Sequence, residues 1–261
     1  SVSSRSFNPY FISLDDLYRQ GLIKKADLKR AKRNDKYIDY NDLSNTRIAL
    51  LRKAYKKFNK KDVEFKSFKK SGEFKDYALF MAIKEKFNGE PFYTWDNGLK
   101  NREKSAISDF LKENRREYNF WLFVQFIAKK QWFSLKSYAN DKGISIMGDM
   151  PLYVALDSVD VWTNPQVFKL DENLKLKKVA GVPPDYFCAD GQLWGNPIYD
   201  WDKMKLNKYS WWINRIKRIF ELTDVLRIDH FRGFEAYWSV PFGEKTAING
   251  KWVKGPGIDL F

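Results

Sequence analysis

Apolar residues recur every three or four positions through most of the first 140 residues, which is the spacing of amphipathic helices. One start is marked by Ser13, with Asp16 three positions later, in the pattern of a helix N-terminal capping box. Helices are predicted over residues 13–22, 44–58, 75–89 and 116–143, with a short extended segment over 37–40. The first 140 residues are therefore expected to be mostly helical.

The pattern changes after residue 140. Residues 144–154 and 224–231 are short apolar runs typical of strands, and residues 209–223 have the spacing of an amphipathic helix. Residues 155–202 between them are rich in Pro, Gly, Asp, Trp and Asn, which predicts a long functional loop. The order strand, loop, helix, strand favours a parallel sheet and an α/β fold.

Composition excludes several classes of protein. The 261 residues are 44% hydrophobic, with no apolar run of the ~18 residues that a membrane span needs. Cys188 is the single cysteine, so no internal disulfide forms and a cytoplasmic location is expected. One histidine and one cysteine give poor support for a metal site. Neither GxxxxGK[ST] nor GxGxxG occurs, so no nucleotide cofactor is expected.

The charge balance raises the question of a nucleic-acid partner. Lys and Arg number 47 against 33 Asp and Glu, a formal net charge of +14. The lysines are interleaved with acidic residues, and no zinc-finger or RNP-type signature accompanies them. A solvated lysine-rich surface is the favoured interpretation, and we expect neither a nucleic-acid nor a membrane partner.

Two predicted strands end in an acidic residue, Asp149 in GDMP and Asp229 in RIDHF. Neighbouring parallel strands would bring both carboxylates to one edge of a sheet. Arg227 and Asp229 share a strand face, and a guanidinium beside a carboxylate lowers its pKa, as a nucleophile for sugar chemistry requires. A purely structural Arg–Asp pair remains open. His230, taken alone, is more typical of a packed or hydrogen-bonded histidine.

Residues 181–202 mix aromatic, amide and acidic side chains. Tyr186, Phe187 and Trp194 offer flat apolar faces, while Asp185 and Gln192 offer hydrogen bonds. Sugars present an apolar C–H face and a rim of hydroxyls, so this mixture suits them. Packed loop aromatics and base stacking are the alternatives.

Long strings of residues resemble a known family. GDMPLYVALDSVDVW, AGVPPDYFCADGQLWGNPIYDW, VLRIDHFRGFEAYWSVP and NGKWVKGPG closely resemble the 4-α-glucanotransferases called amylomaltases or disproportionating enzymes. The resemblance extends from Ser3 to Phe261 and is weakest over 60–130. It implies transfer of α-1,4-glucan segments between maltooligosaccharides, with retention of configuration and no cofactor.

The resemblance also implies roles and a fold. Asp229 matches the nucleophile, Arg227 the arginine that supports it, and Asp149 a donor-site aspartate. The matched substrate-covering loop carries Asp185, Tyr186, Phe187, Gln192 and Trp194, and His230 follows the nucleophile. The implied fold is a partial (β/α)8 TIM barrel with an inserted, mostly helical subdomain. Residues 1–140 would hold the start of the barrel region and the subdomain, and residues 141–261 the central strands with the long loop 155–202.

The sequence departs from the family in one respect. The family's acid/base glutamate, in an Ala-Glu-Asp-Leu-Gly context, and its opening strand are not found in residues 1–261. We therefore expect an interior fragment that is inactive by itself, because a nucleophile needs its acid partner. The alternatives are an α-glucan hydrolase of the same clan, a non-catalytic glucan-binding relic and a nucleic-acid binder.

Overall fold

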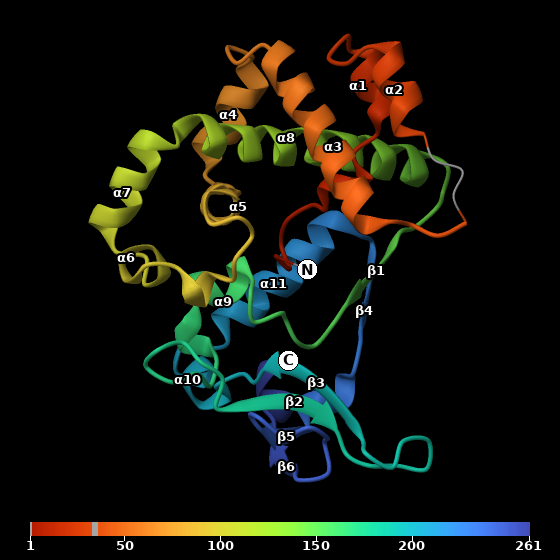
Figure 1. The fold of residues 1–261 in the computed structure, drawn as a ribbon. Coiled ribbons are helices and arrows are strands. Elements are labelled where there is room, and N and C mark those ends of the chain that lie inside the picture. Colours follow the sequence, from red (N-terminus) through yellow and green to blue (C-terminus); the bar gives the residue numbers. More distant parts are fainter. Residues whose placement is uncertain (1, 33–35) are drawn as a thin grey trace. The chain divides into compact units, whose positions relative to one another are not determined.

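The computed structural model describes residues 2–32 and 36–261, a mixed helix and sheet structure (Figure 1). The chain forms two compact units. The helical unit comprises Ser6–Lys86 and Ser108–Asp141. The αβ unit comprises the residues up to Arg5, Phe87–Ile107 and Lys142–Phe261. The units thus alternate along the chain, where the sequence prediction has one division after residue 140.

The helical unit begins with a 3-10 turn and continues in helices. Its elements are η1 (Pro9–Phe11), α1 (Leu14–Arg19), α2 (Lys25–Ala31), α3 (Tyr40–Lys57), α4 (Val63–Ser71), α5 (Lys75–Lys86), most of α7 (Lys104–Glu113) and α8 (Arg115–Asp141). The cap predicted for α1 is confirmed, since the Ser13 hydroxyl accepts the N–H of Asp16. The extended segment predicted to reach Tyr40 is wrong at that residue. Helix α3 begins there because the Asp39 carboxylate accepts the N–H groups of Asn41 and Asp42.

An aromatic core holds the helical unit together. Phe123 on α8 is fully buried, and its ring lies 4.9 Å from that of Phe58 and 5.2 Å from that of Tyr55. Gln125 on the same helix is also fully buried. Its side chain accepts the backbone N–H of Phe7 and donates to the Phe7 carbonyl. Apolar burial therefore stabilises this unit, while the Gln125 side-chain amide fixes the backbone at Phe7 near its start.

The αβ unit combines short helices with two sheets. Its helices are α6 (Asn97–Lys100), α9 (Val159–Thr163), α10 (Trp201–Leu206) and α11 (Ser210–Leu222), with 3-10 turns η2 (Phe92–Thr94), η3 (Pro165–Val167), η4 (Phe231–Phe234) and η5 (Gly257–Leu260). Its strands are β1 (Met147–Met150), β2 (Lys178–Val182), β3 (Gln192–Pro197), β4 (Val225–Ile228), β5 (Ala236–Pro241) and β6 (Lys251–Lys254). Strands β1 and β4 pair in parallel, as predicted, and the other four form an antiparallel sheet in the order β3-β2-β5-β6.

The expectation of an irregular segment over 155–202 is wrong for much of that range. The segment contains α9, β2, β3 and the start of α10. Strand β2 was not predicted, because it is short and includes a glycine, Gly181. A Cβ added at Gly181 would lie 2.5 Å from the Gln192 carbonyl oxygen on β3. Only glycine allows the two backbones to approach so closely. Residues 183–191 remain irregular, and we call them the β2–β3 connection.

No helix within residues 2–32 and 36–261 combines the length and hydropathy that crossing a bilayer would demand.

Candidate functional site

The parallel pair β1–β4 places the two predicted acidic residues side by side. In its register Asp149 lies opposite Arg227, and Met150 lies opposite Ile228. The N–H of Asp229 donates to the Met150 carbonyl at 2.9 Å, so Asp229 directly follows the last paired position. Gly148 is required just before, because an added Cβ would lie 2.8 Å from the Thr223 side chain. Asp149 and Asp229 therefore sit at the same, carboxyl-terminal, edge of the two strands.

Arg227 bonds across the strands rather than along its own strand. Its Nε donates to Asp149 Oδ1 at 3.0 Å and its Nη2 to Oδ2 at 2.6 Å, a bidentate pair that raises the pKa of Arg227. Spacing along the strand predicts a pair between Arg227 and Asp229. In the structure the electrostatic effect of Asp229 on the pKa of Arg227 is smaller than that of Asp149. The reason is the register, since the Asp149 carboxylate directly opposite matches the planar guanidinium fork. Both side chains are more than half exposed, so the pair is open to solvent.

His230 joins this edge to the antiparallel sheet. Its backbone is left-handed, with φ of 52°, and its imidazole lies edge-on to Trp194 of β3 with ring centroids 4.9 Å apart. Trp194 Nε1 in turn donates to Gln192 Oε1 at 3.0 Å. Burial lowers the pKa of His230, with a smaller opposing effect from Asp229. The structure thus brings Gln192, Trp194 and His230 together next to Asp229.

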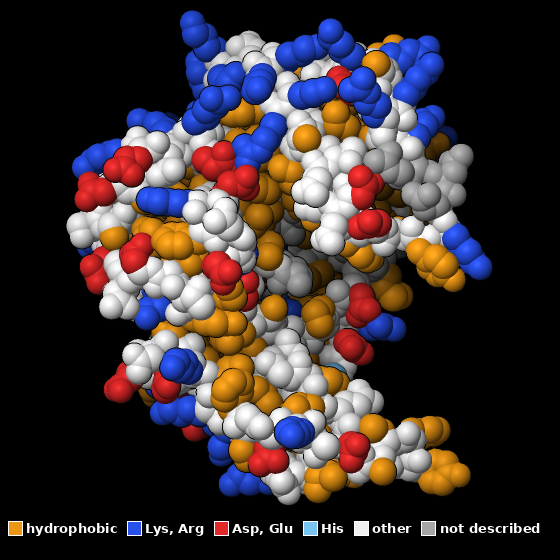
Figure 2. Space-filling view, viewed as in Figure 1, with side chains coloured by type: hydrophobic (Ala, Val, Ile, Leu, Met, Phe, Trp, Pro, Cys, Tyr) orange, Lys and Arg blue, Asp and Glu red, His pale blue; other side chains and the backbone are white. Residues whose placement is uncertain are grey.

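Three other predicted residues lie elsewhere, at the tip of the β2–β3 connection. Tyr186 and Phe187 are 97% and 93% exposed and touch each other edge-to-face at 5.7 Å. The Asp185 carboxylate accepts the N–H groups of Phe187 and Cys188, which stabilises the local turn. The connection projects beyond the two strands, and hydrophobic side chains stand out at its end (Figures 1 and 2). Within the described part of the chain, no hydrogen bond, ion pair or ring contact joins these three residues to Asp149, Arg227 or Asp229.

Two buried residues outside the predicted site, Arg215 and Tyr199, hold the backbone behind Asp149. Arg215 on α11 is 1% exposed and donates to the carbonyls of Leu152 and Pro151 at 3.0 and 2.7 Å. The Tyr199 hydroxyl donates to the same Leu152 carbonyl at 2.8 Å and accepts from Arg215 at 3.1 Å. This clamp fixes the chain immediately after β1. The signal in the sequence is an arginine three residues after Trp212, on the apolar face of a predicted amphipathic helix.

A search of residues 2–32 and 36–261 for three or more His, Cys, Asp or Glu side chains that could hold a metal ion found none. The chemistry available at the edge of β1 and β4 comes from carboxylates, a guanidinium, an imidazole and an indole. Such a set can provide an oriented carboxylate and a flat apolar surface beside it.

Comparison with known proteins shows the family of the chain. Residues 1–261 match the model of glycoside hydrolase family 77, described as 4-alpha-glucanotransferase. The chain is 49% identical to a 4-alpha-glucanotransferase of Clostridium butyricum, with all of this chain and 55% of the relative covered. It is 47% identical to one of Aquifex aeolicus, with 97% of this chain and 52% of the relative covered. The chain therefore belongs to the 4-alpha-glucanotransferase family, and spans about half the length of these relatives.

Solved structures give the same picture. An amylomaltase from Streptococcus agalactiae in complex with acarbose superimposes with a TM-score of 0.95 at 41% identity, covering 100% of this chain and 54% of that one. An amylomaltase from Corynebacterium glutamicum, at 20% identity and a TM-score of 0.74, shares the fold over 97% of this chain and 35% of its own.

Proposed function

We propose that the protein containing this chain is a 4-α-glucanotransferase, which moves α-1,4-glucan segments between maltooligosaccharides. The observation that carries the proposal is Asp229 at the end of β4, beside the Asp149–Arg227 pair at the end of β1. Family membership and the acarbose complex of a 41% identical amylomaltase support a glucan as the substrate class.

The proposed reaction proceeds in two displacements. The Asp229 carboxylate attacks the anomeric carbon, the glycosidic C–O bond breaks, and an acid protonates the leaving oxygen. The 4-hydroxyl of an acceptor sugar then attacks the anomeric carbon of the ester and gives its proton to the deprotonated acid, the C–O bond to Asp229 breaks, and the carboxylate is restored with net retention. Arg227 would stabilise the charges of Asp149 and Asp229 together. By the family resemblance the acid/base is a glutamate outside residues 1–261, so we expect this chain alone not to transfer glucan.

The remaining predicted residues belong to substrate binding in this proposal. Asp149 and His230 would contact the donor sugar at the strand ends. Trp194 and Gln192 would offer an aromatic face and an amide nearby. Asp185, Tyr186 and Phe187 would cover the glucan when the β2–β3 connection closes over it and excludes water. The full exposure of both aromatic side chains supports such a role, because it leaves their faces free for a ligand.

We also propose that β1 and β4 are neighbouring strands of a (β/α)8 barrel and that the helical unit is an insertion. The parallel pairing, with α11 between the two strands in sequence, supports this arrangement. A cytoplasmic location, expected from the single cysteine, belongs to the same proposal.

The test is maltotriose disproportionation by the full reading frame that contains this chain, followed by chromatography of the products. We expect both shorter and longer oligosaccharides, and a loss of at least about 10³-fold in rate for Asp229→Asn. Asp202→Asn, an exposed carboxylate on α10, serves as the matched control and should stay close to wild type. Release of glucose without longer products would instead identify a hydrolase, and an active Asp229→Asn variant would refute the assigned nucleophile.

A further inference from the structure

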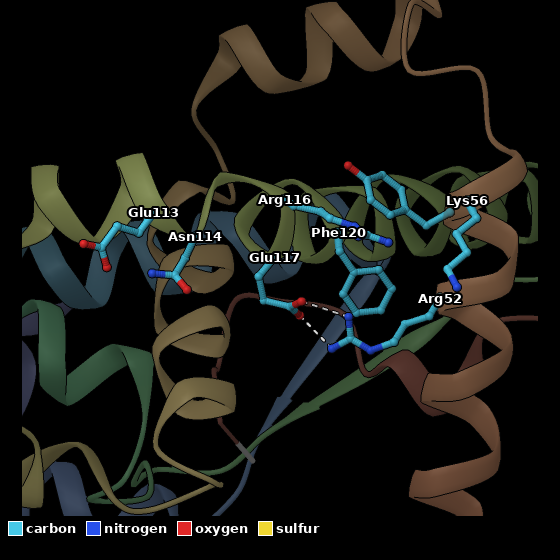
Figure 3. A pocket seen from close by; sticks show the side chains of 8 residues that line it. Arg52, Lys56, Glu113, Asn114, Arg116, Glu117 and Phe120 are labelled. Carbon is cyan, nitrogen blue, oxygen red and sulfur yellow. Dashed lines mark hydrogen bonds and ion pairs between the residues drawn. The ribbon is translucent and has the colours of Figure 1, made fainter.

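A separate pocket of about 370 Å³ lies within the helical unit, between α3 and the start of α8 (Figure 3). The buried residues Tyr55 and Phe120 are among those that line it. Its volume falls in the range typical of small-molecule sites, ~300–1,000 Å³. None of its lining residues takes part in the proposed glucan chemistry.

A fixed ion pair forms the centre of this pocket. Arg52 donates to both carboxylate oxygens of Glu117, at 2.9 and 2.7 Å, and to Glu85 at 2.9 Å. Its guanidinium also lies over the Phe120 ring, 4.3 Å from the centroid. Arg52 is therefore neutralised and immobilised, and its charge is not available to a ligand.

Two further cations line the same pocket without such neutralisation. Among the residues that the structure describes, neither Lys56 nor Arg116 forms an ion pair, and both are exposed. Lys56 comes from α3 and Arg116 from α8, and their heads lie on the same side of the pocket (Figure 3). Burial raises the pKa of Tyr55, and the nearby charge of Arg116 opposes this rise. The Tyr55 hydroxyl is therefore a third donor close to Arg116. These three groups can surround a phosphate with charge-assisted hydrogen bonds.

The other end of the pocket has the opposite character. Glu113 at the end of α7 and Asn114 just before α8 line it there, on the side of Glu117 that faces away from Lys56 (Figure 3). A carboxylate and an amide accept hydrogen bonds from hydroxyl groups and would repel a second phosphate. The pocket is thus bipolar, with donors and positive charge at one end and acceptors at the other.

The charge of the whole helical unit favours the arrival of anions. This unit holds 27 Lys and Arg against 15 Asp and Glu, whereas the αβ unit holds 20 against 18. Seven of these lysines fall within residues 56–70, and Lys and Arg side chains gather over the same helices in Figure 2. A surface of this kind raises the local concentration of anionic ligands at low ionic strength.

From these observations we infer that the pocket binds a phosphorylated sugar. Its phosphate lies between Lys56, Arg116 and the Tyr55 hydroxyl, and its hydroxyl groups reach toward Glu113 and Asn114. The site is distinct from the strand ends of β1 and β4, and its occupancy does not depend on the glucan chemistry proposed for them.

The test is isothermal titration calorimetry of the 261-residue chain at low ionic strength, with glucose 6-phosphate, inorganic phosphate and glucose as separate probes. We expect glucose 6-phosphate to bind best, phosphate more weakly and glucose not at all. The double variant Lys56→Gln/Arg116→Gln should weaken glucose 6-phosphate binding at least about tenfold, since two charge-assisted bonds are lost. Glu113→Gln should weaken the sugar phosphate and leave inorganic phosphate unchanged.

The matched control is Lys66→Gln/Lys70→Gln, which removes the same charge from exposed positions on α4 outside the pocket. It should alter affinity by less than about twofold. Equal losses of glucose 6-phosphate affinity in the two double variants would show that binding depends only on the overall positive charge, and would overturn the site. Equal affinity for phosphate and glucose 6-phosphate would overturn the sugar assignment, and absence of binding heat together with unchanged thermal unfolding would overturn both.

Discussion

The two units of the chain stabilise their key elements by different means. Helix α8 is held mainly by aromatic contacts such as those of Phe123 with Phe58 and Tyr55, to which Gln125 adds hydrogen bonds with Phe7. Strand β1 has exposed residues at Met147 and Asp149, and the chain after it is held by the buried hydrogen bonds of Arg215. Apolar contact is strong but adapts to small shifts, whereas hydrogen bonds fix direction. The αβ unit thus uses polar contacts where a carboxylate must be aimed.

The largest effect is expected in the apolar core. Phe123→Ala removes a fully buried ring and should lower the free energy of unfolding by about 3–5 kcal/mol. Urea denaturation followed by circular dichroism measures the change. Phe11→Ala, at a side chain 86% exposed, is the control and should cost little. A loss below about 1 kcal/mol for Phe123→Ala would contradict the packing described.

A somewhat smaller effect is expected at the polar clamp. Arg215→Met leaves the Pro151 carbonyl and the Tyr199 hydroxyl without their donor, and the Leu152 carbonyl with the Tyr199 hydroxyl alone, and should cost about 2–4 kcal/mol. Hydrogen exchange of the Met150 and Leu152 amides should accelerate more than exchange in α8. Arg215→Lys, which keeps a charged donor, should recover part of both effects. Uniform acceleration across both units would show that Arg215 acts on global stability alone.

Replacing a member of the exposed ion pair should have a small effect on stability. Asp149→Asn weakens a bidentate pair whose side chains are 56% and 62% exposed, and should cost no more than about 1 kcal/mol. A double-mutant cycle with Arg227→Gln gives the coupling directly. A coupling above ~2 kcal/mol would mean that the pair is shielded from water, contrary to its exposure.

The smallest effect is the pH dependence due to His230. Its pKa in the folded chain lies below the ordinary 6.5, because burial against Trp194 disfavours the charged ring. The unfolded chain therefore binds the proton more readily, so this residue contributes stability above pH 6.5 that is lost as the pH falls through its folded pKa. His230 is the only histidine, so its imidazole NMR signals report the titration without overlap. A midpoint above 6.5, or the same acid sensitivity in His230→Gln, would contradict this account.

Local signals in the sequence predicted most long elements. Apolar spacing gave α8 and α11, and the Ser13 cap gave the start of α1. The parallel partners β1 and β4 followed from strand and helix order. Strands β2 and β3 were missed because each is short and contains a glycine, Gly181 or Gly195, which interrupts the alternation typical of a strand.

The acidic residues at the ends of β1 and β4 were predicted to lie at one edge, but the pairing of Arg227 was not predicted correctly. The acidic strand ends are visible in the sequence, whereas the bond from Arg227 to Asp149 depends on the register between strands 78 residues apart. The register is set by tertiary contacts such as that of Gly148 with Thr223. Arg215 was not predicted, because the spacing of residues along a helix does not indicate that an arginine on it bonds to backbone carbonyls of another segment.

The alternation of the two units along the chain bears on the order in which they form during synthesis. The Ser4 hydroxyl and N–H both bond to the Asp160 carboxylate, at 2.6 and 2.7 Å, across 156 positions of sequence. Every residue of the helical unit has been translated by Asp141, before Asp160 exists. We therefore expect the helical unit to fold first on the ribosome. The αβ unit can form its contact between Ser4 and Asp160 only after Asp160 has been translated. Mutations that slow folding of the helical unit would then also delay folding of the αβ unit, although none of them lies in it.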